Sequence, residues 1–299
     1  MSSTLVTRWE ELRELTGGGK RHRAAVDEWL ATRPAVLYWG DSWFSTPLYP
    51  NLARHSAWRI DGLRMIVGKP GATAADLLSA RSVAAMMDRL QNNPFDLLAV
   101  SAGGNDALSE RLQQVFEPWM TSKPPKLEPE DAFQRLVDHK LFERLASRYR
   151  HLLQRVQLDV LPKRKHFRVI SHTYAPLLRI GQAGDLSIPN IGLIAILKDD
   201  VGPWLYGPMK KVLKDSAAAG VFARHLLVDG FGTLVLAAMQ REFAGLFTYS
   251  DLAAVPELAE PAAWYDEIHP TGEGFEACAP HLNAVLRVAL PAAKRAAVG

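Results

Sequence analysis

The feature that most constrains the fold is the alternation of short, apolar, partly β-branched runs with longer amphipathic stretches. Gly, Pro or Asp bounds each apolar run, as is usual for strands that are buried on both faces. This alternation predicts a parallel sheet covered by helices on both sides. Five strands are predicted, at residues 35–39, 63–67, 96–101, 167–171 and 225–228.

The segments between these runs have the pattern of amphipathic helices. In residues 73–90 the apolar side chains recur near one stripe, and Thr73 can cap the first turn. Residues 1–33 are expected to add one or two helices in front of the first strand. The other helices are predicted at residues 131–160, 202–219, 232–247 and 271–297.

Two stretches do not fit the alternation, and we interpret them as lid-like insertions. The first, residues 107–130, contains a segment at 116–130 that is too rich in Pro for regular structure. The second, residues 176–202, mixes apolar residues with Gly after the fourth strand. Connections of this length are often lids or binding loops. Residues 1–299 as a whole are expected to form one domain.

The composition bounds the class of protein. Apolar residues make up 48% and charged residues 22% of the chain, which is ordinary for a soluble protein with a sizeable core. The net charge of +3 is too small and too dispersed to predict a nucleic-acid partner. The single Cys278 excludes an intrachain disulfide and is expected to be a buried thiol. No secretory leader or long apolar run is evident, so a cytoplasmic location without a membrane span is expected.

A serine follows the first predicted strand, in the sequence Gly40-Asp41-Ser42. A side chain at the carboxyl end of a parallel strand faces the crevice in which open α/β sheets bind ligands. A serine acts as a nucleophile only when an adjacent base, oriented by a third group, activates it. By itself the tripeptide is more typical of an ordinary turn.

A candidate base lies near the C-terminal end of the chain. Asp266 and His269 are three residues apart, so they can meet on a tight turn. The carboxylate would then hold one ring nitrogen, and the other would be free to take the serine proton. Thr271 can cap the long helix that follows, which would support the turn.

Two other segments could stabilise a developing negative charge. The third predicted strand runs into Gly103-Gly104-Asn105, where glycines permit close approach and Asn105 offers an amide. After the second strand, Gly71 could offer a backbone N–H at the entrance to a helix, where such groups are unpaired.

In this order the motifs resemble those of the SGNH/GDSL hydrolase superfamily, whose blocks contain Gly-Asp-Ser, Gly, Gly-x-Asn-Asp and Asp-x-x-His. The resemblance spans residues 35–275. It implies a flavodoxin-like, three-layer α/β/α sandwich with a five-stranded parallel sheet, and the activity of an esterase or lipase.

The resemblance also implies a role for each motif residue. For the second block, Gly71 is preferred to Gly68, because Gly71 leads directly into the following helix. The implied roles are nucleophile and first oxyanion donor for Ser42, second donor for Gly71, third donor for Asn105, base for His269 and orienting partner for Asp266.

Aromatic residues beside the motifs are candidates for substrate contact. Trp43, Trp264 and Tyr265 either wall a substrate pocket or pack the edge of the sheet. His172 and Tyr174 follow the fourth predicted strand and face the same crevice. No carboxylate neighbours His172 in the sequence, so a structural role is the favoured interpretation for that residue.

The predicted reaction is hydrolysis of a small-molecule carboxylic ester through an acyl-enzyme. No metal or cofactor is expected, because the histidines lack the spacing of metal ligands. A carbohydrate O-acetyl esterase, a long-chain lipase or thioesterase, an acyltransferase and a catalytically silent binding module stay open as alternatives, as does the oligomeric state.

Overall fold

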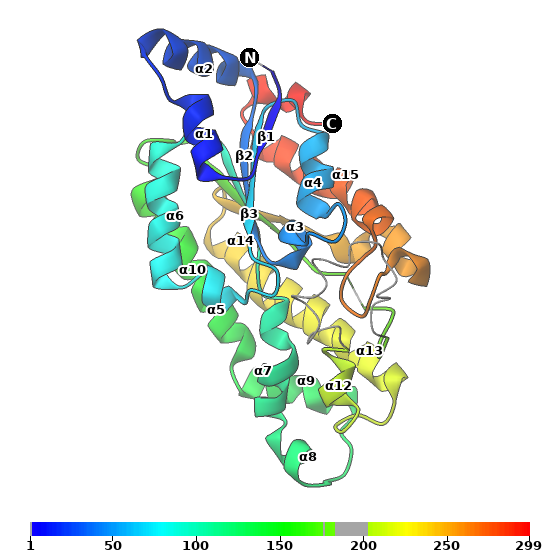
Figure 1. The fold of residues 1–299 in the computed structure, drawn as a ribbon. Coiled ribbons are helices and arrows are strands. Elements are labelled where there is room, and N and C mark those ends of the chain that lie inside the picture. The colour runs from blue at the N-terminus through cyan, green and yellow to red at the C-terminus, as the bar shows by residue number, and fades with distance from the viewer. Residues whose placement is uncertain (1, 176, 183–202) are drawn as a thin grey trace.

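The computed structural model describes residues 2–175, 177–182 and 203–299 (Figure 1). Its centre is one six-stranded sheet in the order β1-β3-β2-β4-β5-β6. Every strand pair in the sheet is parallel. The strands are β1 (Thr4–Val6), β2 (Ala35–Gly40), β3 (Leu63–Gly68), β4 (Leu97–Ser101), β5 (Arg168–His172) and β6 (Phe247–Ser250).

Helices cover both faces of this sheet, so the expected three-layer α/β/α architecture is confirmed. In Figure 1 the helices α6 and α10 lie on one side of the sheet, and α4 and α15 lie on the other. The first layer consists of α1 (Trp9–Thr16), α5 (Ala74–Leu77), α6 (Ala80–Asn92), α10 (Leu141–Asp159), η2 (His225–Ala237) and α14 (Ala238–Glu242). The helix α13 (Ser216–Arg224) extends η2 beyond the end of the sheet (Figure 1). The second layer consists of α3 (Ser42–Ser45), α4 (Leu52–Trp58) and α15 (Gly272–Ala289).

The remaining helices lie at the two ends of the sheet. In Figure 1 α2 (Lys20–Thr32) lies at the end where β2 begins, near the C-terminal turn η6 (Ala292–Ala297). Beyond the opposite end lie α7 (Ser109–Val115), α8 (Glu117–Thr121), α9 (Pro129–Asp138) and α12 (Tyr206–Met209).

Four of the five predicted strands are confirmed, and the fifth, at residues 225–228, is wrong. Those residues lie inside a continuous helix, Ser216–Glu242, whose central part is π-helical. A short apolar run cannot by itself distinguish a buried strand from a buried helix. Gly230, which resembles a strand terminator, serves helix packing: a Cβ there would lie 2.2 Å from the Phe142 ring of α10.

The sheet therefore has six strands in place of five, and its two edge strands were not predicted. The strand β6 covers residues that the pattern assigned to a helix at 232–247 and to the stretch after it. The strand β1 lies within residues 1–33, which were expected to be helical only, and pairs with β3. Edge strands of three or four residues carry too little alternation to be recognised.

Several predicted helices are divided. Residues 73–90 form α5 and α6, and Ser79 caps the second by accepting a hydrogen bond from the Ser82 N–H. The predicted cap at Thr73 is confirmed. The stretch 131–160 is divided into α9 and α10 at Lys140, whose φ is +59°.

The prediction that residues 116–130 lack regular structure is wrong. They contain α8 and the start of α9, because Pro118 and Pro129 occupy first-turn positions, where the missing N–H costs nothing. The predicted insertion at 176–202 lies outside the described residues, apart from 177–182.

One described helix, Ser216–Glu242, is long and apolar enough to span a membrane, because an 18-residue window within it has a mean hydropathy of 1.4. Half of this window is buried inside the fold, and Leu226, Phe231 and Leu236 belong to the core. Core helices meet the same criteria, so the finding is weak evidence for a span, and the absence of a span stays a prediction.

Candidate active site at the carboxyl end of the sheet

Ser42 is the first residue of α3, just beyond the carboxyl end of β2. Gly40 has no room for a side chain, because a Cβ there would lie 2.6 Å from the Cβ of Ser101 on β4. Asp41 caps α3 by accepting a hydrogen bond of 3.1 Å from the Trp43 N–H. Close packing of two central strands and a helix cap therefore position the Ser42 backbone.

Ser42, His269 and Asp266 form a continuous hydrogen-bonded series. The Nε2 atom of His269 is 2.8 Å from the Ser42 Oγ, and its Nδ1 atom is 2.9 Å from the Asp266 Oδ2. The Asp266 Oδ1 also accepts hydrogen bonds from the N–H groups of Ile268, at 2.8 Å, and His269, at 2.7 Å. The carboxylate is thus held by its own turn, so it can fix the ring orientation.

The turn that carries His269 is anchored at both ends. Its closing contact is a 2.8 Å hydrogen bond from the Tyr265 N–H to the His269 carbonyl oxygen. On the helix side, Thr271 caps α15, as predicted, by accepting from the Gly274 N–H at 3.1 Å. On the serine side, the Trp43 Nε1 donates to the Ile268 carbonyl at 3.2 Å.

Asn105 begins a short 3-10 turn, η1 (Asn105–Ala107), after β4. Its Nδ2 donates to the Ala72 carbonyl oxygen at 3.0 Å, which leaves the second N–H of the amide available. Gly103 has φ +120°, and a Cβ there would lie 2.5 Å from the Phe231 ring, so the loop requires glycine. Asn105 and Ser42 line the same cavity.

Gly71 lies in an exposed turn with φ +75° and has open space around its Cα. The neighbouring Ala72 closes this turn through an N–H bond of 3.1 Å to the Lys69 carbonyl. At Gly68, the alternative donor, a Cβ would lie 2.3 Å from the Gly40 carbonyl oxygen, so glycine is required there for close strand packing. The choice of Gly71 as the oxyanion donor stays a prediction.

The cavity beside Ser42 is small, about 30 Å³, and its walls are mostly apolar. Leu226 and Leu227 form part of it; they lie in the predicted strand at 225–228, which the structure shows to be part of the helix Ser216–Glu242. Sequence patterns gave no signal for these walls, because a leucine on a buried helix looks the same wherever it packs. The other apolar wall residues are Leu108, Leu177 and Ile268.

Trp43 and Tyr174, two of the predicted contact residues, line this cavity. His172 does not line it; its ring is stacked on the Trp43 indole, with 5.4 Å between ring centroids. Burial lowers the pKa of His172 to about 4, so the imidazole is neutral at pH 7. Its Nδ1 is 2.9 Å from the Thr173 carbonyl, which fixes the proton on that nitrogen.

Neither Trp264 nor Tyr265 is among the described residues that line the cavity. Trp264 is buried, and its Nε1 donates to the Leu258 carbonyl at 3.0 Å. The ring of Tyr265 packs on Tyr49, with 5.5 Å between centroids. For these two residues the geometry favours packing over substrate contact.

Glu267 is a residue at the site that the sequence did not reveal. It follows Asp266 in the sequence and is fully buried, and its carboxylate accepts three backbone N–H bonds. The donors are Gly181 at 3.0 Å, Leu205 at 2.8 Å and Tyr206 at 2.9 Å. Burial raises its pKa, and the three N–H donors oppose that rise.

Two more side chains, Arg179 and Trp204, contact the same turn. Arg179 donates to the carbonyl oxygens of Trp264 and Tyr265, each at 3.0 Å. Trp204 meets the His269 ring edge-on, with 5.8 Å between centroids.

Within the described part of the chain, no group of three or more His, Cys, Asp or Glu residues could hold a metal ion. Cys278 is buried, as predicted, and burial raises its pKa to about 12.

Solved structures of hydrolases are similar to this one. The lipase Lip_vut3 from a goat rumen metagenome has a TM-score of 0.50 and 16% identity, over 88% of this chain and 99% of that chain. The extracellular lipase from Streptomyces rimosus and phospholipase A1 from Streptomyces albidoflavus NA297 each have a TM-score of 0.47, with 17% and 16% identity. Each of these two alignments covers 84% of this chain and 99% of the other.

No protein-family model and no curated protein matches the chain. The structural similarity concerns the fold alone, which this chain shares with the lipase Lip_vut3.

Proposed function

We propose that this chain is a carboxylic ester hydrolase that works through an acyl-enzyme on Ser42. The observation that carries the proposal is the series from the Ser42 Oγ to the His269 Nε2, at 2.8 Å, and from the His269 Nδ1 to Asp266, at 2.9 Å. A nucleophile, a base in hydrogen-bond reach and an orienting carboxylate are the three parts that such a reaction needs. The fold shared with the goat rumen lipase and the resemblance of the motifs to those of the SGNH/GDSL hydrolases support the same class.

In the first half-reaction, the Ser42 Oγ attacks the ester carbonyl while the His269 Nε2 accepts its proton. The imidazolium formed is stabilised by Asp266, whose two oxygens lie within 3.1 Å of Nδ1. Collapse of the tetrahedral intermediate expels the alcohol, to which His269 returns the proton. In the second half-reaction, water replaces the alcohol and releases the acid.

The tetrahedral oxyanion requires N–H donors on the side of the carbonyl opposite the base. Ser42 opens α3, where backbone N–H groups have no partner within the helix. Asn105 lines the same cavity and has one N–H that is not used by Ala72. We assign these two groups and the Gly71 N–H to the oxyanion hole.

The walls of the cavity support a short apolar acyl group. A volume of about 30 Å³ compares with the roughly 10–15 Å³ that one water needs. Five aliphatic side chains form much of its wall. The polar side chains that line it are already engaged: Tyr174 bonds Asp41, and Ser42 and Asn105 are assigned to the reaction. The acyl side of a small ester therefore suits this cavity better than a long fatty chain or a sugar.

The proposal is tested by hydrolysis of p-nitrophenyl esters from acetate to palmitate, with acetylated sugars assayed in parallel. We expect activity on the short esters that disappears in Ser42→Ala and in His269→Ala. A folded wild-type protein that hydrolyses none of these esters would favour the silent binding module. Transfer of the acyl group to an added alcohol in preference to water would favour the acyltransferase.

A further inference from the structure

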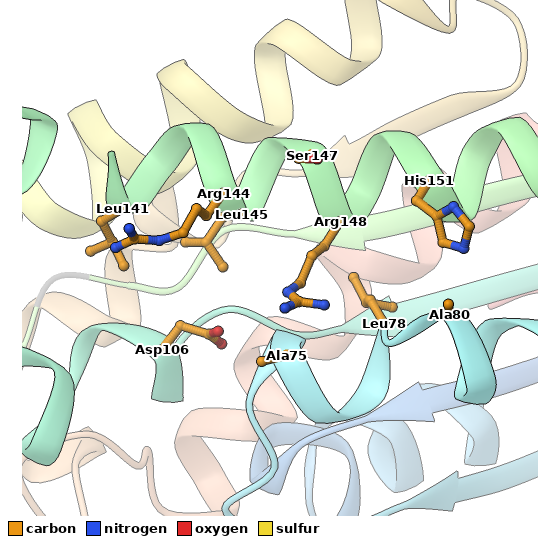
Figure 2. Close-up of a pocket in the computed structure, with 10 residues that line it drawn as sticks. All are labelled: Ala75, Leu78, Ala80, Asp106, Leu141, Arg144, Leu145, Ser147, Arg148 and His151. Atoms are coloured by element: carbon orange, nitrogen blue, oxygen red, sulfur yellow. The ribbon is translucent and has the colours of Figure 1, made fainter. Parts of the chain in front are cut away.

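A second and larger cavity, about 420 Å³, lies between α10 and the α5–α6 segment (Figure 2). It is distinct from the cavity around Ser42. The loop after β4 separates the two, because Asn105 lines the cavity of Ser42 and Asp106 lines the second one. Nothing in the proposed reaction uses this second cavity.

Three basic side chains of α10 line it. Arg144, Arg148 and His151 are four and three residues apart, which places them on one face of the helix. Figure 2 shows this face opposite Ala75 and Asp106, with the Arg148 guanidinium reaching into the space between the helices. Arg144 and Arg148 are like charges four residues apart, and such a pair destabilises an isolated helix. A bound anion would remove this repulsion.

Among the described residues, no carboxylate lies within 4.0 Å of the Arg144 or the Arg148 guanidinium, whereas other arginines on α10 have such a partner. Arg150 forms a bidentate pair with Glu242, at 2.7 and 2.8 Å, and Arg155 pairs with Asp159. Arg144 and Arg148 take part in none of the ion pairs found in the described part of the chain.

Asp106, which lines the cavity, and Asp76, next to the lining residue Ala75, both accept hydrogen bonds from backbone N–H groups. Asp106 accepts from the Ala74 N–H at 2.5 Å. Asp76, whose pKa is lowered first by the Thr73 N–H and, last among the causes, by Arg148, belongs to the capping box of α5. Both acids therefore serve the first turn of α5.

The cavity also offers an unused polar atom and an apolar floor. The Nε2 atom of His151 is buried and has no hydrogen-bond partner within the described residues. Leu78, Leu141 and Leu145 are buried and line the cavity. A ligand that satisfies this surface must combine a negative charge with an apolar part.

We propose that this cavity binds a small organic anion. Its carboxylate or phosphate group lies between the Arg144 and Arg148 guanidinium groups, and its apolar part packs on Leu78, Leu141 and Leu145. Guanidinium groups suit both anions, because their planar N–H forks match carboxylate and phosphate oxygens. His151 supplies a further hydrogen bond through Nε2.

The test is isothermal titration of the full chain with phenyl phosphate, benzoate and inorganic phosphate. We expect one site for an aromatic anion, with inorganic phosphate binding at least several-fold more weakly because it lacks the apolar part. Arg144→Gln and Arg148→Gln should each raise the Kd about tenfold or more. Arg150→Gln, which removes the same charge from another face of α10, should leave the Kd within about twofold.

Two further arms separate the alternatives. Ser42→Ala should bind phenyl phosphate as the wild type does, and loss of binding in that variant would place the ligand in the other cavity and overturn the proposal. Absence of any binding, or an unchanged Kd in a folded Arg148→Gln variant, would overturn it equally. Binding only to phosphatidic acid vesicles, with none to the soluble anions, would contradict a small-molecule site in favour of a lipid surface.

Discussion

Tyr174 donates a hydrogen bond of 2.5 Å to Asp41, the residue immediately before Ser42. The other Asp41 oxygen accepts from the Ser101 Oγ at 2.7 Å and from the Trp43 N–H. One buried carboxylate thus ties the ends of β4 and β5 to the backbone that carries Ser42. Burial raises the pKa of Asp41 to about 6, and the hydrogen bonds from Tyr174 and Ser101 oppose that rise.

This environment predicts a pH-dependent contribution of Asp41 to stability. The pKa of an aspartate in the unfolded chain is 3.8, and in the fold it is about 6. Between these values the folded state binds the proton more tightly, so the stabilising contribution is complete below pH 3.8 and is lost as the pH rises through 6. The shift corresponds to about 3 kcal/mol.

Urea unfolding of the wild type and Asp41→Asn between pH 3.5 and 7.5 measures this contribution. The wild type should lose about 3 kcal/mol relative to the variant over that range. Asp27→Asn, at an exposed position on α2, is the matched control. A difference between wild type and Asp41→Asn that does not change with pH would rule out the effect.

Asn105→Ala tests the oxyanion hole. Removal of one donor typically lowers kcat about 10²–10³-fold, and the same loss is expected here with little change in KM. Asn105 also bonds Ala72, so the melting temperature must be measured alongside. Turnover near that of the wild type in a folded variant would contradict the assigned role.

Glu267→Ala should destabilise the protein by about 3 kcal/mol or more, because three backbone N–H groups would lose their acceptor. Glu267→Gln keeps one acceptor oxygen and the shape of the side chain, so its free energy of unfolding should lie between those of wild type and Glu267→Ala. Glu257→Ala, an exposed glutamate, should change the free energy by no more than about 0.5 kcal/mol. Equal effects of the Glu257 and Glu267 changes would disprove the role of Glu267 as the acceptor of three backbone N–H groups.

The apolar cavity predicts a preference for short acyl chains that Leu227 helps to set. With the wild type, kcat/KM should fall steeply beyond butyrate in the p-nitrophenyl series. Leu227→Ala should move the optimum to longer chains, because it removes one wall of the cavity. Leu286→Ala, in the core on α15, is a control that loses packing away from the cavity. A wild-type profile that rises toward palmitate would reverse the assignment to short esters.

The sequence was sufficient to predict the centre of the sheet and the motifs at its carboxyl end. Buried parallel strands such as β2 and β4 are continuous apolar runs, and the motif residues follow them directly. The structure brings Ser42, Asp266, His269 and Asn105 together at the carboxyl end of the sheet, as the motif order predicts.

The remainder depends on contacts between distant residues that no local pattern encodes. Gly230 marks a close approach of helices, although in the sequence it resembles the end of a strand. Glu267 has the same local context as any acid on a turn, and only the positions of Leu205 and Gly181 reveal its function. The walls of the cavity were missed for the same reason.

The most direct test of the central claim is labelling with a fluorophosphonate, read by intact mass and peptide mapping. The account predicts one adduct per chain, on Ser42, that Ser42→Ala abolishes and His269→Ala slows by orders of magnitude. Failure of the folded wild-type protein to react, or equal labelling of Ser42→Ala, would contradict it.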